Sequence, residues 1–373
     1  MDALMLPLNW QRVRLGDIAE INPPTIIPNV FYYIDLESVE KGQLLNKQLM
    51  IKNKAPSRAR RLLSKNDILY QLVRPYQRNN YFFTLNGNYV ASTGYAQIRT
   101  LQNPSFLYFA LHSNYFVNAV LDRCEGTSYP AISSNELKKC EVILPPLNEQ
   151  IAIANILSDV DRYLYSLRAL ILKKESVKKA LSFELLSQRK RLKGFNQAWQ
   201  KVRLGDICEI TTGSLDANEM VHYGKYRFYT CAKEYYFIDK YAFDTEAILI
   251  SGNGAYVGYV HYYKGKFNAY QRTYVLDNFS EHIIFVKYFL TMFLQSHIQT
   301  NRNEGNTPYI VMATLKDFEI LLPPLNEQIA IANILSALDN EIISLKNKKR
   351  QFENIKKALN HDLMSAKIRV LKK

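Results

Sequence analysis

The sequence predicts an α+β protein in which two mixed α/β domains are separated by two long antiparallel coiled-coil helices, with an internal pseudo-two-fold repeat. Two observations predict this architecture. The fifteen residues LPPLNEQIAIANILS occur at Leu144–Ser158 and again, unchanged, at Leu322–Ser336. Behind each copy, apolar residues recur at the alternating four- and three-residue spacing of a coiled coil. We expect domains at residues 1–146 and 194–324, and helices at residues 147–193 and 325–373.

The duplication extends beyond this segment. The stretch WQRVRLGDI at Trp10–Ile18 reappears as WQKVRLGDI at Trp199–Ile207, and a looser pair, GTSYPAI and GNTPYI, occurs at Gly126–Ile132 and Gly305–Ile310. Repeats of this size indicate a repeated structural unit, so each domain and the helix behind it form one repeat.

Each domain has the composition of a mixed α/β fold. Tyr89–Arg99 and Tyr256–Tyr263 are rich in Val, Ile, Tyr and Thr, which predicts strands. Phe106–Leu121 and Ile283–Ile298 carry apolar residues at helical spacing. A short apolar run then leads into Pro-Pro in both domains.

The helices begin after Pro-Pro, where Asn148 is the expected N-cap and Glu149 suits the positive end of the helix dipole. The apolar seam of each helix is one row of heptad positions: Ile153, Leu157, Val160, Leu164, Leu167, Ile171, Leu181 and Leu185 in the first, and Ile331, Leu335, Leu338, Ile342, Leu345, Phe352, Leu359 and Leu363 in the second. Two unrelated helices, each packed on its own domain, are the alternative.

Chain geometry predicts the direction of the pair. A helix of about 45 residues is roughly 65 Å long, whereas the ends of a domain of about 125 residues lie within ~40 Å of each other. The link at residues 194–198 is short. The second domain must therefore follow the far end of the first helix, and the second helix can pair with the first only by running back along it.

Composition limits the classes of function. The net charge of +14 and pI near 9.4 suggest a polyanionic partner, although residues 194–324 alone are slightly acidic. No apolar run is long enough for a membrane span and the N-terminus lacks the order of a secretory signal, so we expect a cytoplasmic protein. The cysteines form no CxxC pair and the histidines show no ligand spacing, so no metal site is expected.

Taken together, two variable domains, VRLGDI starts and paired LPPLNEQ helices resemble the specificity (S) subunit of a type I restriction–modification enzyme. Further family-like detail is the Ser92-Thr93-Gly94-Tyr95 stretch and the KKAL of Lys178–Leu181, matched at Lys356–Leu359. The resemblance implies that each domain is a target-recognition domain reading one half of a split sequence in double-stranded DNA. It also implies that the helices set the spacing and dock two modification subunits.

Cofactors and catalysis would then belong to the partners. The resemblance implies adenine methylation with S-adenosylmethionine on the modification subunits, and ATP, Mg and cleavage on restriction subunits, with no catalytic residue or bound cofactor in this chain. Asn22-Pro23-Pro24-Thr25 is similar to an amino-methyltransferase motif but lacks its aromatic residue, so we interpret it as a turn. The alternatives are a stand-alone DNA-binding or scaffold protein and a catalytic DNA methyltransferase.

Basic residues interleaved with aromatic and amide side chains predict the DNA-contacting surfaces, since Arg and Gln can pair with base edges and Lys and Arg neutralise phosphates. Solvated loops are the alternative for each stretch. The candidates in the first domain are Lys52, Lys54, Arg58, Arg60, Arg61, Arg74, Tyr76, Gln77 and Arg78. Those in the second are Lys225, Arg227, Asn253, Tyr256, Gln271 and Arg272, with the glycine-rich residues 252–258 predicted to form a hairpin near DNA.

The polar residues of the fifteen-residue repeat predict a docking surface, because an apolar core gives no reason for their identity in both copies. Two copies of one partner, bound at two equivalent surfaces, would give that reason; recent recombination between the copies is the alternative. The predicted docking residues are Asn148, Glu149, Gln150, Asn155 and Ser158, with Asn326, Glu327, Gln328, Asn333 and Ser336.

Overall fold

The computed structural model describes residues 6–301 and 308–371. These form two compact units: unit 1 contains the residues up to Arg168 and those from Asn347 onward, and unit 2 contains Ala169–Lys346. Each unit holds one mixed domain and part of both long helices. The predicted limits after residues 146, 193 and 324 stay predictions, because the units divide each helix in its middle.

The domain of unit 1 consists of short strands and short helices. Its two four-stranded sheets have the orders β6-β3-β10-β7 and β2-β11-β8-β9. The strands are β1 (Gln11–Arg14), β2 (Ala19–Ile21), β3 (Val30–Ile34), β4 (Val39–Glu40), β5 (Gln43–Leu44), β6 (Gln48–Ile51), β7 (Ala59–Leu62), β8 (Ile68–Gln71), β9 (Tyr81–Phe82), β10 (Tyr89–Ser92), β11 (Tyr95–Thr100) and β12 (Glu141–Leu144). The helices are α1 (Leu15–Ile18), α2 (Pro104–Ala110), α3 (Asn114–Leu121) and α4 (Ser134–Lys139).

The domain of unit 2 is built on one six-stranded sheet of order β14-β19-β17-β18-β15-β16. The strands are β13 (Gln200–Arg203), β14 (Glu209–Thr212), β15 (Tyr226–Tyr229), β16 (Tyr236–Ile238), β17 (Phe243–Ser251), β18 (Val260–Ala269), β19 (Thr273–Asp277) and β20 (Glu319–Leu322). The helices are α6 (Ile283–Asn301) and α7 (Met312–Lys316).

Some predicted elements are divided in the structure. Tyr89–Arg99 is not one strand, because a turn at Thr93-Gly94 separates β10 from β11. Phe106–Leu121 contains two helices, with Ser113 capping the second. The strand predicted from Tyr256 begins only at Val260, since the preceding loop includes Gly258 at φ +79°. Residues 252–258 do form the predicted hairpin connection, between the antiparallel strands β17 and β18.

The two sequence signatures of each repeat meet in a small sheet. In unit 1, β1 pairs with β12, with Gln11 opposite Leu144. In unit 2, β13 pairs with β20, with Gln200 opposite Leu322. The VRLGDI start and the strand before Pro-Pro therefore recur together because they are hydrogen-bonded neighbours that close each domain.

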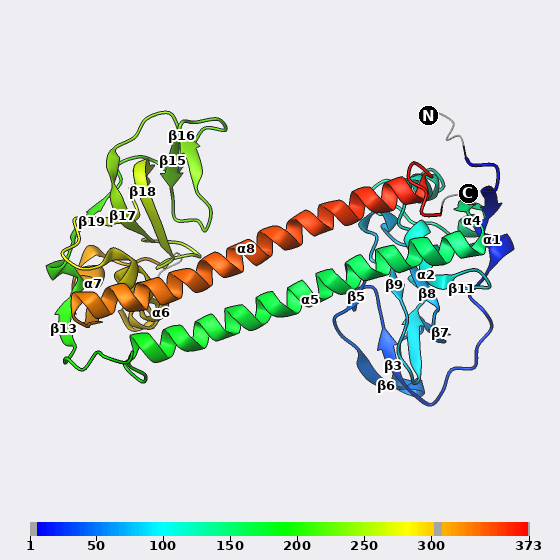
Figure 1. The fold of residues 1–373 in the computed structure, drawn as a ribbon, viewed down its shortest axis with the longest axis horizontal. Helices are drawn as coiled ribbons and strands as arrows, with labels where there is room; N and C mark the ends of the chain where they lie inside the picture. Colours follow the sequence, from blue (N-terminus) through cyan, green and yellow to red (C-terminus); the bar gives the residue numbers. More distant parts are fainter. Residues whose placement is uncertain (1–5, 302–307, 372–373) are drawn as a thin grey trace. The chain divides into compact units, whose positions relative to one another are not determined.

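The long helices are α5 (Leu147–Leu186) and α8 (Leu325–Met364), each 40 residues long and continuous (Figure 1). The prediction that Asn148 is the N-cap is wrong. The helix begins at Leu147, two residues before the start that an Asn148 cap implies, and the carbonyl of Pro146 accepts from Gln150 N at 3.0 Å. The carbonyl of Pro146 thus accepts the first hydrogen bond of the helix, as the carbonyl of an N-cap residue does.

The helices pair in antiparallel fashion within each unit, which confirms the predicted fold class. In unit 1, Asp161 pairs with Lys356 at 2.6 Å and Arg168 with Glu353 at 3.2 Å, so the residue number falls along α8 as it rises along α5. In unit 2, Lys174 pairs with Glu341 at 2.8 Å. Lys178 pairs with Asp339 and Arg191 with Glu327 further along α5.

The ion pairs repeat crosswise between the helices. Asp161 and Lys356 correspond, 178 positions away, to Asp339 and Lys178. One contact breaks the pattern: the Tyr163 and Phe352 rings lie 4.6 Å apart in unit 1, where unit 2 has the Lys174–Glu341 ion pair.

Both ends of the pair contribute to the domain cores. The core of unit 1 includes Ile153 and Leu157 from the start of α5 and Leu363 from the end of α8. That of unit 2 includes Ile331 from the start of α8 and Leu185 from the end of α5. Each domain is therefore packed against the first turns of one helix and the last turn of the other.

Candidate nucleic-acid interface

Three loops meet in the same way in both domains. In unit 1, Leu72 N donates to Gly94 O at 3.0 Å, and Ile132 N donates to Leu72 O at 3.0 Å. In unit 2, Gly252 N donates to Arg272 O at 2.8 Å, and Ile310 N donates to Gly252 O at 2.9 Å. The loop after β8 in unit 1 is therefore equivalent to the loop after β17 in unit 2.

This equivalence explains the loose sequence pair GTSYPAI and GNTPYI. The described part of the second copy, Pro308–Ile310, packs on residues 252–254 as Pro130–Ile132 packs on residues 72–74. Gly305–Thr307 lie outside the described residues. The paired segments hold the loop backbones in place in both domains.

The first basic segment of unit 1 faces solvent. Lys52 and Lys54 form a 3-10 turn after β6, and Arg58 and Arg60 are also exposed. Arg61 is half-buried in β7, and burial lowers the pKa of its guanidinium. Because Thr93 N donates to Arg58 O at 2.9 Å, this segment and the loop after β8 meet at the same β10–β11 turn. The structure thus brings together the two candidate stretches of the first domain.

The second stretch divides into exposed and internal residues. Tyr76 and Gln77 are exposed, and the Arg74 guanidinium lies 4.3 Å from the centre of the Tyr129 ring. Arg78 is a correction to the predicted set, since it donates to His112 O at 3.0 Å and to Asn114 Oδ1 at 2.8 Å. It braces the loop against α3 and has two of its donor nitrogens engaged within the protein.

In unit 2, Arg227 lies among tyrosines. Its guanidinium carbon is 4.2 Å from the Tyr235 ring centre and 4.5 Å from that of Tyr263. Tyr229 contacts both of these rings and accepts a long hydrogen bond of 3.4 Å from Arg227. Rings on two sides restrict the arginine side chain, which lowers the entropy lost when it binds an acceptor.

The other candidates of unit 2 lie on connected loops. Asn253 and Tyr256 belong to the loop after β17, and Arg272 is bonded to that loop through its carbonyl. Gln271 is exposed and donates to Asp216 Oδ1 at 2.7 Å. Lys225 is exposed and directly precedes β15.

Several ring partners were missed in the sequence. Tyr129, Tyr235 and Tyr263 hold the arginines, and Lys233 lies 5.1 Å from the Tyr256 ring centre. In a chain with 26 tyrosines, composition alone does not distinguish these from core residues. The recurring GTSYPAI segment was the available signal for Tyr129.

The fifteen-residue repeat contains a buried cluster that corrects the predicted docking set. Glu149 is 2% exposed; its carboxylate accepts from Trp10 Nε1 at 3.0 Å and from Arg369 Nε and Nη2 at 2.6 and 2.9 Å. Glu327 repeats this cluster with Trp199 Nε1 at 3.1 Å and Arg191 Nε and Nη2 at 3.1 and 2.6 Å. We call each Trp–Glu–Arg cluster a clamp. It joins the domain start, the first turn of one helix and the segment behind the other helix.

Gln150 and Gln328 are also used internally. Gln150 accepts from Asn103 N at 3.1 Å and donates to Pro145 O at 2.8 Å; Gln328 accepts from His282 N at 3.0 Å and donates to Pro323 O at 2.8 Å. The Glu and Gln of each copy therefore have an internal reason for their identity, and the expectation that they face a partner is wrong.

The remaining repeated polar residues differ in exposure. Asn148, Asn155, Asn326 and Asn333 are exposed, whereas Ser158 and Ser336 are half-buried. Beside the asparagines, Leu147 and Ile151 are 54% and 42% exposed, and their counterparts Leu325 and Ile329 are 51% and 36% exposed. The same apolar and amide side chains thus face outward at both copies.

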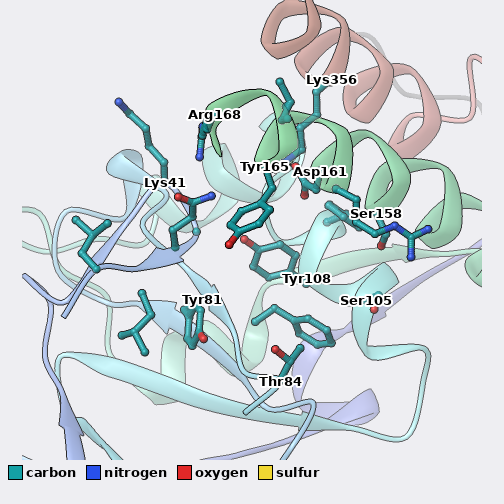
Figure 2. A pocket seen from close by; sticks show the side chains of 18 of the residues that line it. Lys41, Tyr81, Thr84, Ser105, Tyr108, Ser158, Asp161, Tyr165, Arg168 and Lys356 are labelled. Carbon is teal, nitrogen blue, oxygen red and sulfur yellow. Dashed lines mark ion pairs between the residues drawn. The ribbon is translucent and has the colours of Figure 1, made fainter. Parts of the chain in front are cut away.

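A cavity of about 1250 Å³ lies within unit 1, between the domain and the long helices (Figure 2). Tyr81, Tyr108 and Tyr165 line it together with charged residues from α5 and α8. Among its lining cations, Lys356 and Arg168 are paired with Asp161 and Glu353. The lining includes Ser158 of the predicted docking set and none of the predicted DNA-contacting residues.

The remaining motifs have structural roles. Asn22-Pro23-Pro24-Thr25 follows β2, where Asn22 Oδ1 accepts from Gln97 N at 2.9 Å, as expected of a turn.

Among the described residues, no cluster of three or more His, Cys, Asp or Glu side chains could hold a metal ion. None of the described helices is long and apolar enough to cross a membrane. The four cysteines are free thiols.

The fold is duplicated, and cations and rings lie at or beside the equivalent loops of both domains, as expected of a two-domain nucleic-acid-recognition protein. The family model for the type I restriction modification DNA specificity domain matches residues 7–175 and 196–354. The chain belongs to this family and carries its domain twice, which confirms the resemblance found in the sequence. Specificity subunits are DNA-recognition subunits and are not themselves catalytic.

Two relatives illustrate the match. The chain is 38% identical to the type I restriction enzyme EcoDI specificity subunit of Escherichia coli over 170 residues, which are 45% of this chain and 37% of that protein. It is 24% identical to the MjaVIII specificity subunit of Methanocaldococcus jannaschii over 423 aligned residues, covering 99% of this chain and 95% of that protein.

Solved structures share the fold. A type I restriction–modification S subunit from M. genitalium matches with a TM-score of 0.65 and 18% identity, covering 96% of this chain and 98% of that one. A chain from a study of complex assembly and conformational transition of the type I R-M system matches with a TM-score of 0.58 and 22% identity, with the same coverage. At these identities the likeness supports the fold alone.

Proposed function

We propose that this chain directs a type I restriction–modification complex to a bipartite sequence in double-stranded DNA. Each domain reads one half of the site, and the paired helices set the spacing between the halves. The observation that supports the proposal is the equivalence of the loops around Leu72 and Gly252. Arg74 and Tyr129 lie at the first, and Tyr256 and Arg272 lie at the second. Two readers of one design on one chain suit a site with two halves.

Exposed cations favour DNA as the ligand of these loops. Lys52, Lys54, Arg58 and Arg60 gather on one segment of the first domain, and cations in such a cluster neutralise phosphates. The second domain supplies fewer cations and more rings, with Arg227 and Lys233 beside tyrosines. Its contribution to affinity should therefore depend less on salt than that of the first domain.

The outward faces of the fifteen-residue repeats are the proposed docking sites for two modification subunits. Leu147 and Ile151 are one helical turn apart, and Asn155 continues the row. Large apolar side chains exposed at identical places in two copies are typical of a surface covered by a partner. Asn148, Asn155, Asn326 and Asn333 remain in the proposed set, with Ser158 and Ser336 at its margin.

The partner subunits would supply the chemistry. S-adenosylmethionine and adenine methylation belong to the modification subunits in this proposal, and ATP, Mg and cleavage to restriction subunits. A protein that reads cellular DNA acts where that DNA lies, and we keep the predicted cytoplasmic location as part of the proposal. The alternatives of a stand-alone DNA-binding scaffold or a catalytic methyltransferase gain no specific observation in their favour.

The function is tested by mapping N6-methyladenine in DNA from cells that express this chain with its modification partner. We expect one split motif, with methylated adenines on opposite strands in its two halves. A continuous motif would contradict the two-reader proposal. Methyl transfer by this chain alone would establish the methyltransferase alternative instead.

The docking sites are tested by stoichiometry. Ile151→Glu should remove one of two modification subunits from the purified complex, Ile329→Glu the other, and the double variant both, as measured by native mass spectrometry. Leu172→Glu is the matched control, because Leu172 is 65% exposed on α5 outside the repeated segment. Retention of two partners by the double variant would place the docking surface elsewhere.

A further inference from the structure

Arg74 has a backbone conformation that residues with side chains rarely adopt. It lies in the loop after β8 at φ 53° and ψ 54°, in the left-handed region. A Cβ atom is disfavoured there because it approaches the neighbouring carbonyl oxygen. Strain of this kind persists where the surrounding structure imposes it, and it is concentrated at functional sites.

The second domain provides the matched comparison. Gly254 N donates to Pro308 O at 2.9 Å, as Arg74 N donates to Pro130 O at 2.7 Å, and Gly254 also has a positive φ of 79°. A Cβ added to Gly254 would meet no atom within 4 Å. The loop therefore forms without any side chain at this position, and glycine would be the less strained choice for the first domain as well.

The arginine side chain is oriented and available. Its guanidinium carbon lies 4.3 Å from the centre of the Tyr129 ring, and Tyr129 is itself 64% exposed. Among the described residues, no carboxylate lies within 4.0 Å of the guanidinium to form an ion pair. Stacking limits the orientations of the planar group and leaves its N–H groups for an acceptor.

We infer that Arg74 is a specificity-determining residue of the first domain and reads a guanine in the first half-site, with Tyr129 as its positioning residue. The inference rests on the proposed function. Guanine presents two acceptors, O6 and N7, that match the fork of an arginine, and this is the commonest base-specific contact in the major groove. Phosphate contact alone gives no reason for holding a cation in a strained position, because exposed lysines of the same domain such as Lys52 and Lys54 can make it from unstrained backbone.

The experiment compares Arg74→Gly, which copies the second domain, with Lys52→Ala in the complete complex with the modification subunits. Motifs are mapped by N6-methyladenine sequencing, and binding is measured on duplexes that carry the wild-type motif or single-base changes. For Arg74→Gly we expect one base position of the first half-site to lose its preference by roughly tenfold to a hundredfold. The second half-site and the spacing should stay unchanged, and the melting temperature of the chain should not fall.

The controls separate the possible results. Lys52→Ala should weaken binding to all sequences alike, and Tyr129→Leu should relax the same base position as Arg74→Gly to a smaller extent. An unchanged motif, or a uniform loss without relaxed preference, would overturn the role of Arg74. A clear fall in melting temperature would show that the side chain supports the fold instead. Arg74→Lys keeps the charge and removes the fork, so it should also relax the base if Arg74→Gly fails to assemble.

A wild-type motif that is continuous would overturn the proposed function itself. That outcome is read from the unmodified complex, whereas the role of Arg74 is read from the change in one base position. The two failures are therefore distinct.

Discussion

At the residue scale, equivalent positions in the two repeats can have different functions. Arg74 and Gly254 share one backbone conformation, but only the first carries a side chain toward solvent. Glu149 and Glu327, in contrast, are the same residue because each is buried against an equivalent tryptophan, Trp10 or Trp199. Divergence is thus found on the proposed reading loops, and identity at the contacts between domain and helix.

His112 is a half-buried histidine that is neutral near pH 7, and its protonation should destabilise unit 1. Its Nδ1 lies 2.7 Å from Tyr108 O, and Nε2 faces Asn80 Nδ2 at 3.4 Å, so Nε2 is the acceptor. Burial lowers the pKa of His112 to about 4, with Lys356 and Arg78 nearby adding to the effect. The unfolded chain, with an ordinary histidine pKa near 6.5, binds the proton first.

We therefore expect the free energy of unfolding of the chain to fall as pH drops from about 6.5 to 4, by up to about 1.4 kcal/mol per pH unit from this group. Chemical denaturation at several pH values measures this slope. His112→Gln should flatten the slope, whereas the exposed His361→Gln should leave it unchanged. Equal slopes in His112→Gln and the unmodified chain would contradict the assignment.

At the element scale, the clamps fix each domain to both helices. Arg369 follows α8 and reaches the first turn of α5, and Arg191 follows α5 and reaches the first turn of α8. Both glutamates are almost fully buried, and an arginine supplies the opposite charge beside each carboxylate. Removing one partner of a buried pair leaves an uncompensated charge, which costs about 3–5 kcal/mol.

Arg369→Gln should therefore destabilise unit 1 by a few kcal/mol, with a change in Trp10 fluorescence as the clamp opens. Glu149→Gln should cost less, because Arg369 lies nearer the surface and can be solvated. The control is Arg162→Gln, which removes an exposed pair with Asp159 and should cost no more than about 1 kcal/mol. Equal effects of Arg369→Gln and Arg162→Gln on the unfolding free energy would contradict the clamp.

The elements also show what sequence patterns predict. The heptad spacing of apolar residues correctly predicted that α5 and α8 are long helices and that they pair. A long periodic pattern of this kind is set by local sequence and depends little on other parts of the chain. The predicted Asn148 cap was wrong, since the helix begins at Leu147 and Pro146 therefore occupies the N-cap position. The buried roles of Glu149 and Gln150 were missed because Arg369 and Asn103 are far from them in sequence, and contacts of that range leave no local pattern.

The candidate DNA surface was predictable only as a set of segments. Basic composition identified residues 52–61 and 74–78. The structure joins the first segment through Arg58, and the loop before the second through Leu72, to the turn formed by Thr93-Gly94. Composition could not show that Arg78 turns inward while Arg74 faces Tyr129. That difference depends on backbone torsions and on a tyrosine some fifty positions away.

At the scale of the whole molecule, the chain is two readers built from one repeated unit, joined by helices that belong to both. Each unit receives its helix segments from two distant parts of the sequence, so neither domain is independent of the pair. On the proposed function, this construction converts helix length into the distance between the two halves of a DNA site. A change confined to the middle of both helices should leave the reading loops untouched.

The most direct measurement deletes seven residues from both helices, near Lys174 in α5 and near Phe352 in α8, and maps the methylated motif. Seven residues preserve the heptad row and shorten each helix by about 10 Å. We expect both half-site sequences to remain and the spacer between them to become shorter, by at most about three base pairs. Altered half-site sequences, or an unchanged spacer in an assembled complex, would contradict the account.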